Sequence, residues 1–163
     1  MSIFDSNAMM EHVYKGHIDT DYHSCPIGEY MAQIDPDSIK LREVIFQKIE
    51  GSGVSLDLMW NILDEDVKKA MNLDKPQARQ SFLLDTINGN KIDFGVNRNM
   101  RLKGIIKACD LNTGNFKLSA LKNQVGWVKV EHRPDDKDPS IIYAEVTRVT
   151  NLAKIRDQQA AAE

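Results

Sequence analysis

Apolar and polar side chains alternate through the ten residues Val54–Leu63, which follow the glycine-bounded turn Gly51–Gly53. A period of two places one class of side chain on each face of a β-strand, so one face of this strand is expected to be buried. Glycine adopts the positive φ angles of tight turns at no steric cost, which makes the turn a hairpin signal. The segment therefore predicts a β-hairpin between Lys40–Glu50 and Val54–Leu63, with Trp60 in the core.

The same signals predict further strands and two more hairpins. The additional strands expected are Glu29–Ile34, Ser81–Ile87, Lys91–Phe94, Gln124–Arg133 and Ser140–Thr150. Two short helices interrupt them. Asp64 is expected to cap the first, Glu65–Leu73, and Asn97 the second, Arg98–Asp110, whose apolar residues recur every three or four positions.

Strands that are joined mainly as hairpins favour an antiparallel sheet that curls into a small barrel. We therefore predict a mainly β, α+β fold, a five-stranded barrel of the oligonucleotide-binding (OB) type with two short helices. A β-sandwich is the alternative that the same strand pattern allows. The length of 163 residues fits one domain, which we place at residues 25–151, between an N-terminal arm (1–24) and a C-terminal tail (152–163).

The net charge of −3 conceals an uneven distribution of charge along the sequence. From Lys91 to Arg133 there are nine basic and three acidic side chains, a local charge of +6, so the remaining residues together carry −9. A positive region in an otherwise acidic chain is typical of a face that binds a polyanion while the rest of the surface repels it. The alternative is that the charges of this block intermix with the others once the chain has folded.

Basic and aromatic side chains also share predicted outward faces in the last hairpin. Trp127, Lys129 and Arg133 lie on one face of their strand, and Tyr143 lies on the matching face of the partner strand. Single-stranded nucleic acid is bound by flat side chains that stack on bases and by cations along the phosphates, with little sequence preference. The alternative placement for Trp127 is in the core, beneath the helix Arg98–Asp110.

Patterns for metal binding and catalysis are weak. His12, His17, His23 and Cys25 lie close together but lack the paired spacing of zinc ligands. Cys25 and Cys109 lie 84 positions apart, neither has the setting of an activated thiol, and no phosphate-loop or nucleophile-elbow motif occurs. Neither a membrane-spanning run nor a signal peptide is evident. We therefore predict a non-enzymatic, cytoplasmic protein without a metal or cofactor.

Four segments resemble a family of small phage proteins that are encoded beside replication and recombination genes. They are Pro26–Tyr30, Gly53–Trp60, Leu102–Ala108 and Leu121–Val130. The likeness covers residues 26–150. It implies a phage-encoded single-stranded-DNA-binding protein with an OB-type barrel, which acts in replication, recombination or repair in the host cytoplasm. The N-terminal arm has no counterpart in this pattern and is a candidate for binding replication or recombination proteins.

The leading hypothesis is therefore a non-catalytic protein that binds single-stranded DNA largely independently of sequence; RNA would satisfy the same chemistry. The residues expected to contact phosphates are Lys40, Arg42, Lys48, Arg98, Arg101, Lys103, Lys107, Lys129 and Arg133, and those expected to stack on bases are Trp127 and Tyr143. The alternative is a phage-origin protein-interaction module, an inhibitor, adaptor or nucleic-acid mimic that acts on a host factor through the acidic first 37 residues. An exposed strand edge would also permit a homodimer.

Overall fold

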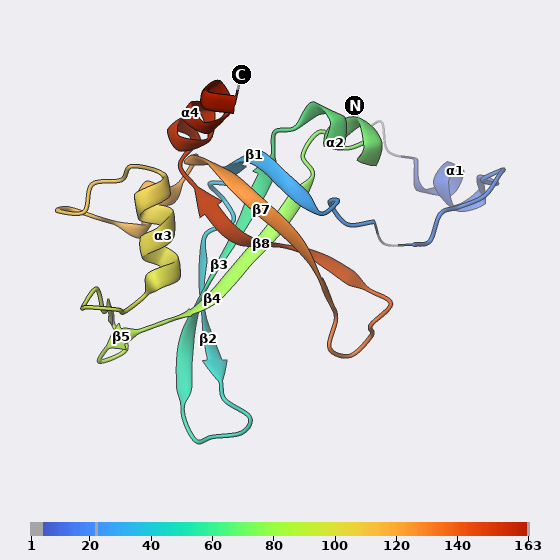
Figure 1. The fold of residues 1–163 in the computed structure, drawn as a ribbon. Helices are drawn as coiled ribbons and strands as arrows, with labels where there is room; N and C mark the ends of the chain where they lie inside the picture. The colour runs from blue at the N-terminus through green and yellow to red at the C-terminus, as the bar shows by residue number, and fades with distance from the viewer. Residues whose placement is uncertain (1–4, 22, 163) are drawn as a thin grey trace.

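The computed structural model describes residues 5–21 and 23–162 (Figure 1). The strands are β1 (Gly28–Ile34), β2 (Lys40–Ile45), β3 (Ser52–Ile62), β4 (Gln77–Leu84), β5 (Thr86–Ile87), β6 (Lys91–Ile92), β7 (Val125–Pro134) and β8 (Ile142–Thr150). The helices are α1 (Ser6–Glu11), α2 (Glu65–Met71), α3 (Met100–Ala108) and α4 (Leu152–Ala162), with one 3-10 turn, η1 (Leu118–Leu121). Each predicted strand and helix is present, although most of their ends are shifted.

Five strands close into a barrel. Each pairs with the next in the order β1, β3, β4, β8 and β7, and β7 pairs again with β1. All of these pairings are antiparallel except the one between β4 and β8, where Arg79 stands opposite Glu145 in parallel register. Along the chain, α3 lies between the third and fourth strands of the barrel. The fold is thus the predicted OB-like barrel rather than a β-sandwich.

The hairpin formed by β2 and β3 projects from the barrel (Figure 1). Its loop is Phe46–Gly51 and not the predicted Gly51–Gly53, because Ser52 and Gly53 already belong to β3. The Phe46 N–H donates to the carbonyl oxygen of Gly51 at 3.1 Å. The Phe46 ring also packs on Gly53, where an added Cβ would come within 2.9 Å of the ring carbon Cζ. Gly53 therefore makes room for a side chain instead of forming the turn.

The barrel interior is apolar apart from one polar pair. Trp60 is completely buried, as predicted, and its Nε1 donates to Oε1 of Gln80 at 2.8 Å. The apolar side chains around this pair are Ala32, Ile34, Leu56, Leu58, Ile62, Ala78, Phe82, Leu84, Val128, Val130, Ala144 and Val146. Gln80 also explains why the predicted strand Ser81–Ile87 began four residues too late, since a polar residue at an inward position interrupts the alternation.

Helix α3 begins two residues later than predicted, and Asn97 does not cap it. The residue before it is Asn99, which adopts a left-handed conformation with a φ of 51°. The Asn99 side-chain amide donates to the backbone oxygens of Asp85 at 2.8 Å and Asp93 at 2.7 Å. Asn99 thus anchors the start of α3 to the β5–β6 hairpin, a role that depends on tertiary contacts and is invisible in a local capping pattern.

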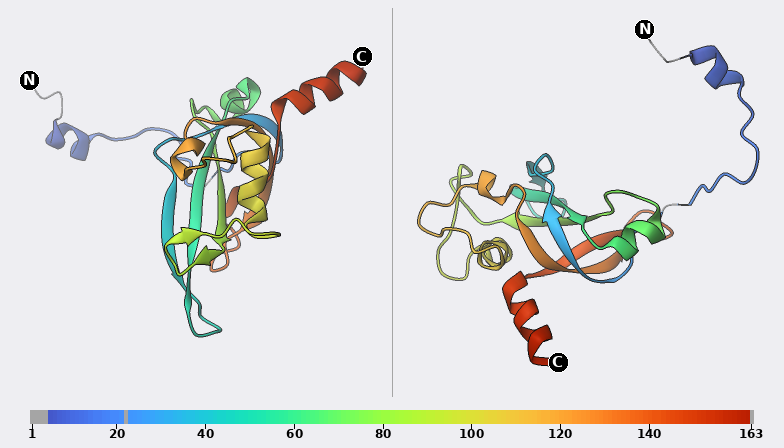
Figure 2. Two further views of the ribbon diagram at one scale, coloured as in Figure 1. Left: turned by 90° about the vertical axis from the view of Figure 1, so that its left-hand side faces the viewer. Right: turned by 90° about the horizontal axis from the view of Figure 1, so that it is seen from above.

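Both ends of the described chain extend from the barrel (Figure 2). Neither α1 nor α4 contains a buried residue. The barrel region begins at Ser24, whose Oγ donates to the carbonyl oxygen of Ile142, and at Cys25, which is buried. Residues 1–4 and 22 of the predicted arm and residue 163 of the predicted tail lie outside the described residues. No helix in residues 5–21 and 23–162 is long and apolar enough to cross a membrane.

Candidate nucleic-acid interface

Arg79, on the outward face of β4, lies where several of the predicted basic residues converge. It lines one hollow together with Lys40 and Arg42 of β2. It also lines a second hollow together with Arg101 of α3 and Arg148 of β8. The closure of the barrel between β4 and β8 brings these side chains onto one surface, although they are far apart in the sequence.

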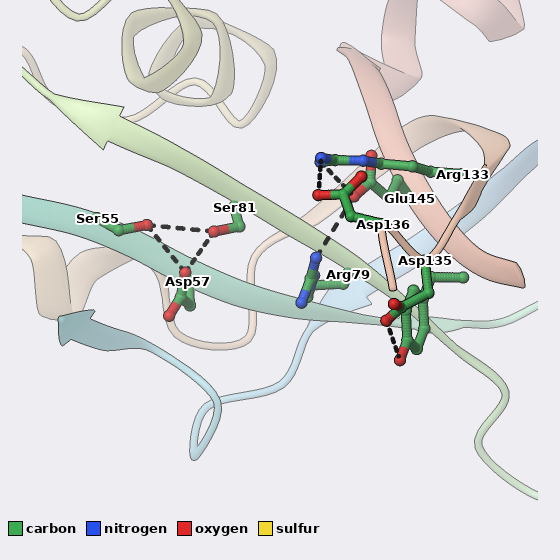
Figure 3. Close-up of polar contacts among 9 residues, drawn as sticks. Ser55, Asp57, Arg79, Ser81, Arg133, Asp135, Asp136 and Glu145 are labelled. Carbon is green, nitrogen blue, oxygen red and sulfur yellow. Dashed lines mark hydrogen bonds and ion pairs between the residues drawn. The ribbon is translucent and has the colours of Figure 1, made fainter. Parts of the chain in front are cut away.

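Two guanidinium groups share one carboxylate beside this closure (Figure 3). Nη2 of Arg79 lies 3.5 Å from Oε1 of Glu145, and Nη1 of Arg133 lies 3.6 Å from the same oxygen. Arg133 also approaches Asp136, with 3.7 Å between Nη2 and Oδ2. The Cζ atom of Arg79 is 5.8 Å from the centre of the Tyr143 ring, within the range of a cation–π contact. These contacts fix the orientation of both arginines and of the tyrosine.

The loop between β7 and β8 is held beside Tyr143 by Asp135. The backbone N–H groups of Lys137 and Asp138 donate to Oδ1 of Asp135 at 2.7 and 3.1 Å, and the Tyr143 hydroxyl donates to Oδ2 at 3.2 Å. The two backbone hydrogen bonds, followed by the one from Tyr143, hold the pKa of Asp135 below its ordinary value. The carboxylate therefore remains ionised at neutral pH and organises the tip of this hairpin.

Asp57 organises the neighbouring face of β2, β3 and β4 (Figure 3). Its Oδ1 accepts hydrogen bonds from the hydroxyls of Ser55, at 3.0 Å, and Ser81, and its Oδ2 accepts one from Nε of Arg42 at 3.1 Å. Partial burial acts to raise the pKa of Asp57, but the hydrogen bonds from Arg42, Ser81 and Ser55 outweigh it, so the pKa lies below its ordinary value.

The two hollows that meet at Arg79 differ in charge. The one beside β2 is lined by three bases and three acids, which cancel: Lys40, Arg42, Arg79, Asp35, Asp37 and Asp57. The one beside α3 is lined by three bases and one acid, a charge of +2: Arg79, Arg101, Arg148 and Glu145. Formal positive charge is therefore higher on the α3 side of Arg79, where Arg101 forms no ion pair with a described residue.

The other cations predicted in and before α3 differ in their contacts. Arg98 approaches Asp93, with 4.0 Å between Nε and Oδ2, and Nζ of Lys103 donates to the carbonyl oxygen of Gly95 at 2.6 Å. Both side chains thus bind the loop that precedes α3. Lys107 instead lines a third hollow, next to β8 and α4.

The remaining predicted cations lie elsewhere. Lys48 is exposed in the loop Phe46–Gly51, at the tip of the β2–β3 hairpin. Nζ of Lys129 lies 3.3 Å from Oε1 of Glu131 on the same strand face. Neither residue lines either of the two hollows described above for Arg79.

Trp127 is half-buried on the outward face of β7, because its neighbours Gly126 and Val128 point inward. It is therefore not the core residue that the alternative placement required. Tyr143 pairs with Arg133, which lies six residues along β7 from Trp127. At the rise of a β-strand this separation is about 20 Å, so the structure does not bring the two predicted stacking residues together.

Sequence reasoning missed Arg79 and Arg148. The predicted strand began at Ser81, which left Arg79 in a loop without an assigned face. The outward positions of β4 nevertheless alternate through Gln77, Arg79, Ser81 and Leu83. The signal was thus present, and only the buried Gln80 concealed it.

The structure offers little for nucleophilic or metal chemistry in the described residues. Burial raises the pKa values of Cys25 and Cys109 to about 11, so both thiols are protonated at neutral pH. No group of three or more His, Cys, Asp or Glu side chains in residues 5–21 and 23–162 is placed to hold a metal ion. The histidines His12, His17 and His23 therefore do not converge with Cys25.

No protein-family model, no curated protein and no solved structure matches this chain. The surface around Arg79 is the part of the molecule whose chemistry bears on function. That surface combines oriented guanidinium groups, a tyrosine ring and a hollow of net positive charge. Such groups bind phosphate oxygens and aromatic bases.

Proposed function

We propose that this protein binds single-stranded DNA without catalysis and largely independently of base sequence, and that it acts in phage DNA replication, recombination or repair. The observation that carries the proposal is the position of Arg79 between two hollows, which makes the cations of β2, α3 and β8 part of one surface beside Tyr143. The phage assignment rests on the sequence resemblance.

The architecture supports this reading. OB barrels bind oligonucleotides on the face of their second and third strands and through the loops beside it. In this barrel those strands are β3 and β4, and the neighbouring loops belong to the β2–β3 and β7–β8 hairpins, which both project from the barrel (Figure 1). Arginine and lysine would contact phosphates there, and Tyr143 would stack on a base. Every base has an aromatic face, so binding of this kind tolerates any sequence.

Fluorescence anisotropy with a labelled oligo-dT and with a duplex of equal length, at two salt concentrations, tests the proposal. We expect micromolar or tighter binding of the single strand, weaker binding of the duplex, and a steep loss of affinity as salt rises, because phosphate contacts release counterions. Absence of single-strand binding at low salt would overturn the proposal.

Arg79→Gln is the variant that addresses the site most directly. It removes the cation shared by both hollows, while Glu145 keeps its contact with Arg133. We expect single-strand affinity to fall about 10-fold or more, as for the loss of one charge-assisted hydrogen-bond donor. Lys69→Gln is the matched control, because Lys69 is an exposed base on α2 that lines none of the hollows around Arg79. Equal losses in the two variants would show that net charge, and not this surface, governs binding.

The N-terminal arm supports a second candidate function, protein interaction. Met10, Val13, Tyr14 and Ile18 expose their apolar side chains in this acidic segment. Exposed apolar groups among charges are typical of segments that bind a partner protein. Met10→Ser combined with Tyr14→Ser should abolish association with a replication or recombination protein of the same phage, measured by surface plasmon resonance, and leave DNA binding unchanged. Retention of that association in the variant would exclude the arm as its site.

A further inference from the structure

Gly104 lies in the middle of α3 and lines both the hollow beside Arg101 and the hollow beside Lys107. A helix with glycine in its interior is less stable than the same helix with alanine, so the glycine in α3 needs a physical explanation. Gly104 has no positive φ that would require glycine. Apart from the adjacent residues Lys103 and Ile105 and the helix backbone, no heavy atom of the described chain lies within 4 Å of the point where a Cβ would stand. Neither backbone conformation nor internal packing accounts for this glycine, and the space beside it is open to a molecule from outside.

The two hollows form one groove between α3 and β8, because Gly104 and Val149 line both of them. Five bases and two acids line the groove, which gives it a charge of +3. The bases are Arg79, Arg101, Lys107, Arg148 and Lys154. This groove is therefore more positive than the neutral hollow beside β2.

The acids of the groove are already engaged. Glu145 lies between Arg79 and Arg133, and Oδ2 of Asp110 accepts a hydrogen bond from Nδ2 of Asn151 at 2.9 Å. Among the bases, Arg148 pairs with Glu29 outside the groove, at 2.9 Å between Nη2 and Oε1. Arg101, Lys107 and Lys154 form no ion pair with any described residue, so their charge is available to an anion.

We propose that the sugar–phosphate backbone of single-stranded DNA continues from the surface around Arg79 into this groove and passes over Gly104. This inference rests on the proposed function. Arg101 and Lys107 would contact phosphates from α3, and Lys154 would contact them from α4. No aromatic side chain lines the groove, so it suits phosphates and not bases. The glycine leaves room for a DNA backbone to approach closely, which a long or negatively charged side chain at this position would prevent.

Two oligonucleotides of different length distinguish binding in this groove from binding at the surface around Arg79. A dT oligomer of about 6 nucleotides would occupy the surface around Arg79, and one of about 15 nucleotides would also reach the groove, within the range of site sizes known for OB folds. Gly104→Glu places a side chain and a negative charge on the floor of the groove. We expect this variant to bind the longer oligomer about 10-fold more weakly than the wild type and to lose less affinity for the shorter one, because Gly104 also lines the hollow that Arg79 shares with Arg101. Gly104→Ala adds a single methyl group and should bind both oligomers within about 2-fold of the wild type.

Substitution of two groove cations of α3 gives a second test, in which the rest of the helix sequence is unchanged. Arg101→Gln combined with Lys107→Gln should lower the slope of log affinity against log salt by about 1.4 for the longer oligomer, because each phosphate contact on a single strand contributes about 0.7. Circular dichroism of each variant shows whether the fold is kept.

The outcomes distinguish the two proposals. If the wild type binds neither oligomer, both the proposed function and the groove are wrong. If the wild type binds both, while Gly104→Glu and the double variant match it in affinity and salt slope on the longer oligomer, the groove is wrong and the proposed function stands. A loss that is clearly larger for the longer oligomer than for the shorter one supports the groove.

Discussion

The indole Nε1 of Trp60 donates a 2.8 Å hydrogen bond to the side-chain oxygen of Gln80 inside an otherwise apolar barrel. The two residues belong to the paired strands β3 and β4, and this hydrogen bond joins a completely buried indole to an amide that is 8% exposed. A buried polar group that loses its partner keeps the cost of desolvation, so each residue requires the other.

Gln80→Leu should therefore lower the free energy of unfolding by about 1–3 kcal/mol, because it leaves the indole N–H without an acceptor. Urea denaturation measures this change. Trp60→Phe combined with Gln80→Leu should cost less than the sum of the two single changes, since the double variant leaves neither group unsatisfied. Additive losses would contradict a specific coupling between the two side chains.

Stacking should depend on Tyr143 and not on Trp127. Tyr143 stands beside Arg79, whereas Trp127 lies about 20 Å away along β7. We expect Tyr143→Ala to weaken binding of a short oligo-dT by about 1–3 kcal/mol, the contribution of one stacked base, and Trp127→Ala to leave it within about 2-fold. Tyr143→Phe is the control that keeps the ring and removes the hydroxyl. The opposite ranking of the two alanine variants would place the DNA on the β7 side of the barrel.

Asp57 should contribute to the pH dependence of stability. Its pKa is lower in the folded protein than its ordinary value of 3.8, so ionised Asp57 stabilises the fold above that value. The contribution is lost as the pH falls through the folded pKa, when the carboxylate binds a proton. The unfolding free energy of the wild type should thus fall more between neutral pH and about pH 3 than that of Asp57→Asn, as measured by urea denaturation. Parallel pH profiles for the two proteins would show that Asp57 carries no such linkage.

Both thiols should be slow to react in the native protein. Burial raises the pKa values of Cys25 and Cys109 to about 11, so almost no thiolate is present at pH 7.5, and Cys25 is also only 1% exposed. We expect alkylation by iodoacetamide at this pH to be much slower than in urea-unfolded protein, with the rate increasing toward pH 11. Rapid native modification at pH 7.5 would contradict the burial of these residues.

Gly104→Ala should stabilise the protein. The added methyl group meets no atom of the described chain outside its own helix within 4 Å, and alanine favours the helix by roughly 0.5–1 kcal/mol relative to glycine. A higher melting temperature, followed by circular dichroism, would reveal this gain. A lower melting temperature would indicate that the space beside α3 is needed by the folded chain itself.

The sequence predicts the barrel well because its strands follow local rules. Alternation identified β3 with Trp60 on its inner face, and Asp64 caps α2 as expected, with Val67 N–H at 3.0 Å from its Oδ1. Errors arose where a tertiary contact overrides the local pattern. Gln80 faces inward because Trp60 offers it a donor, and Asn99 precedes α3 because Asp85 and Asp93 accept from its amide.

The candidate site was harder to predict than the fold. The charge block from Lys91 to Arg133 includes Arg101 and Lys107, which line the groove beside α3, but it could not show that Arg98 and Lys103 bind their own loop. Arg79 was assigned no strand face because the buried Gln80 interrupts the alternation of β4. Its convergence with the cations of α3 and β8 depends in addition on the contact between β4 and β8, which are far apart along the chain. Spatial convergence of this kind leaves no trace in residue spacing.

The contact between β4 and β8 affects the stability of the barrel. The described parts of β4 and β8 meet in only one parallel register pair, Arg79 with Glu145, whereas the other pairings of the barrel extend over three or more. The barrel is thus a rolled sheet in which the contact between β4 and β8 is short and includes the ion pair between Arg79 and Glu145. A ligand that draws the Arg79 guanidinium away from Glu145 therefore also weakens the contact between β4 and β8. Binding of a ligand at the surface around Arg79 is therefore coupled to transient opening of the barrel between β4 and β8. Amide hydrogen exchange along these two strands would report both the binding and the opening.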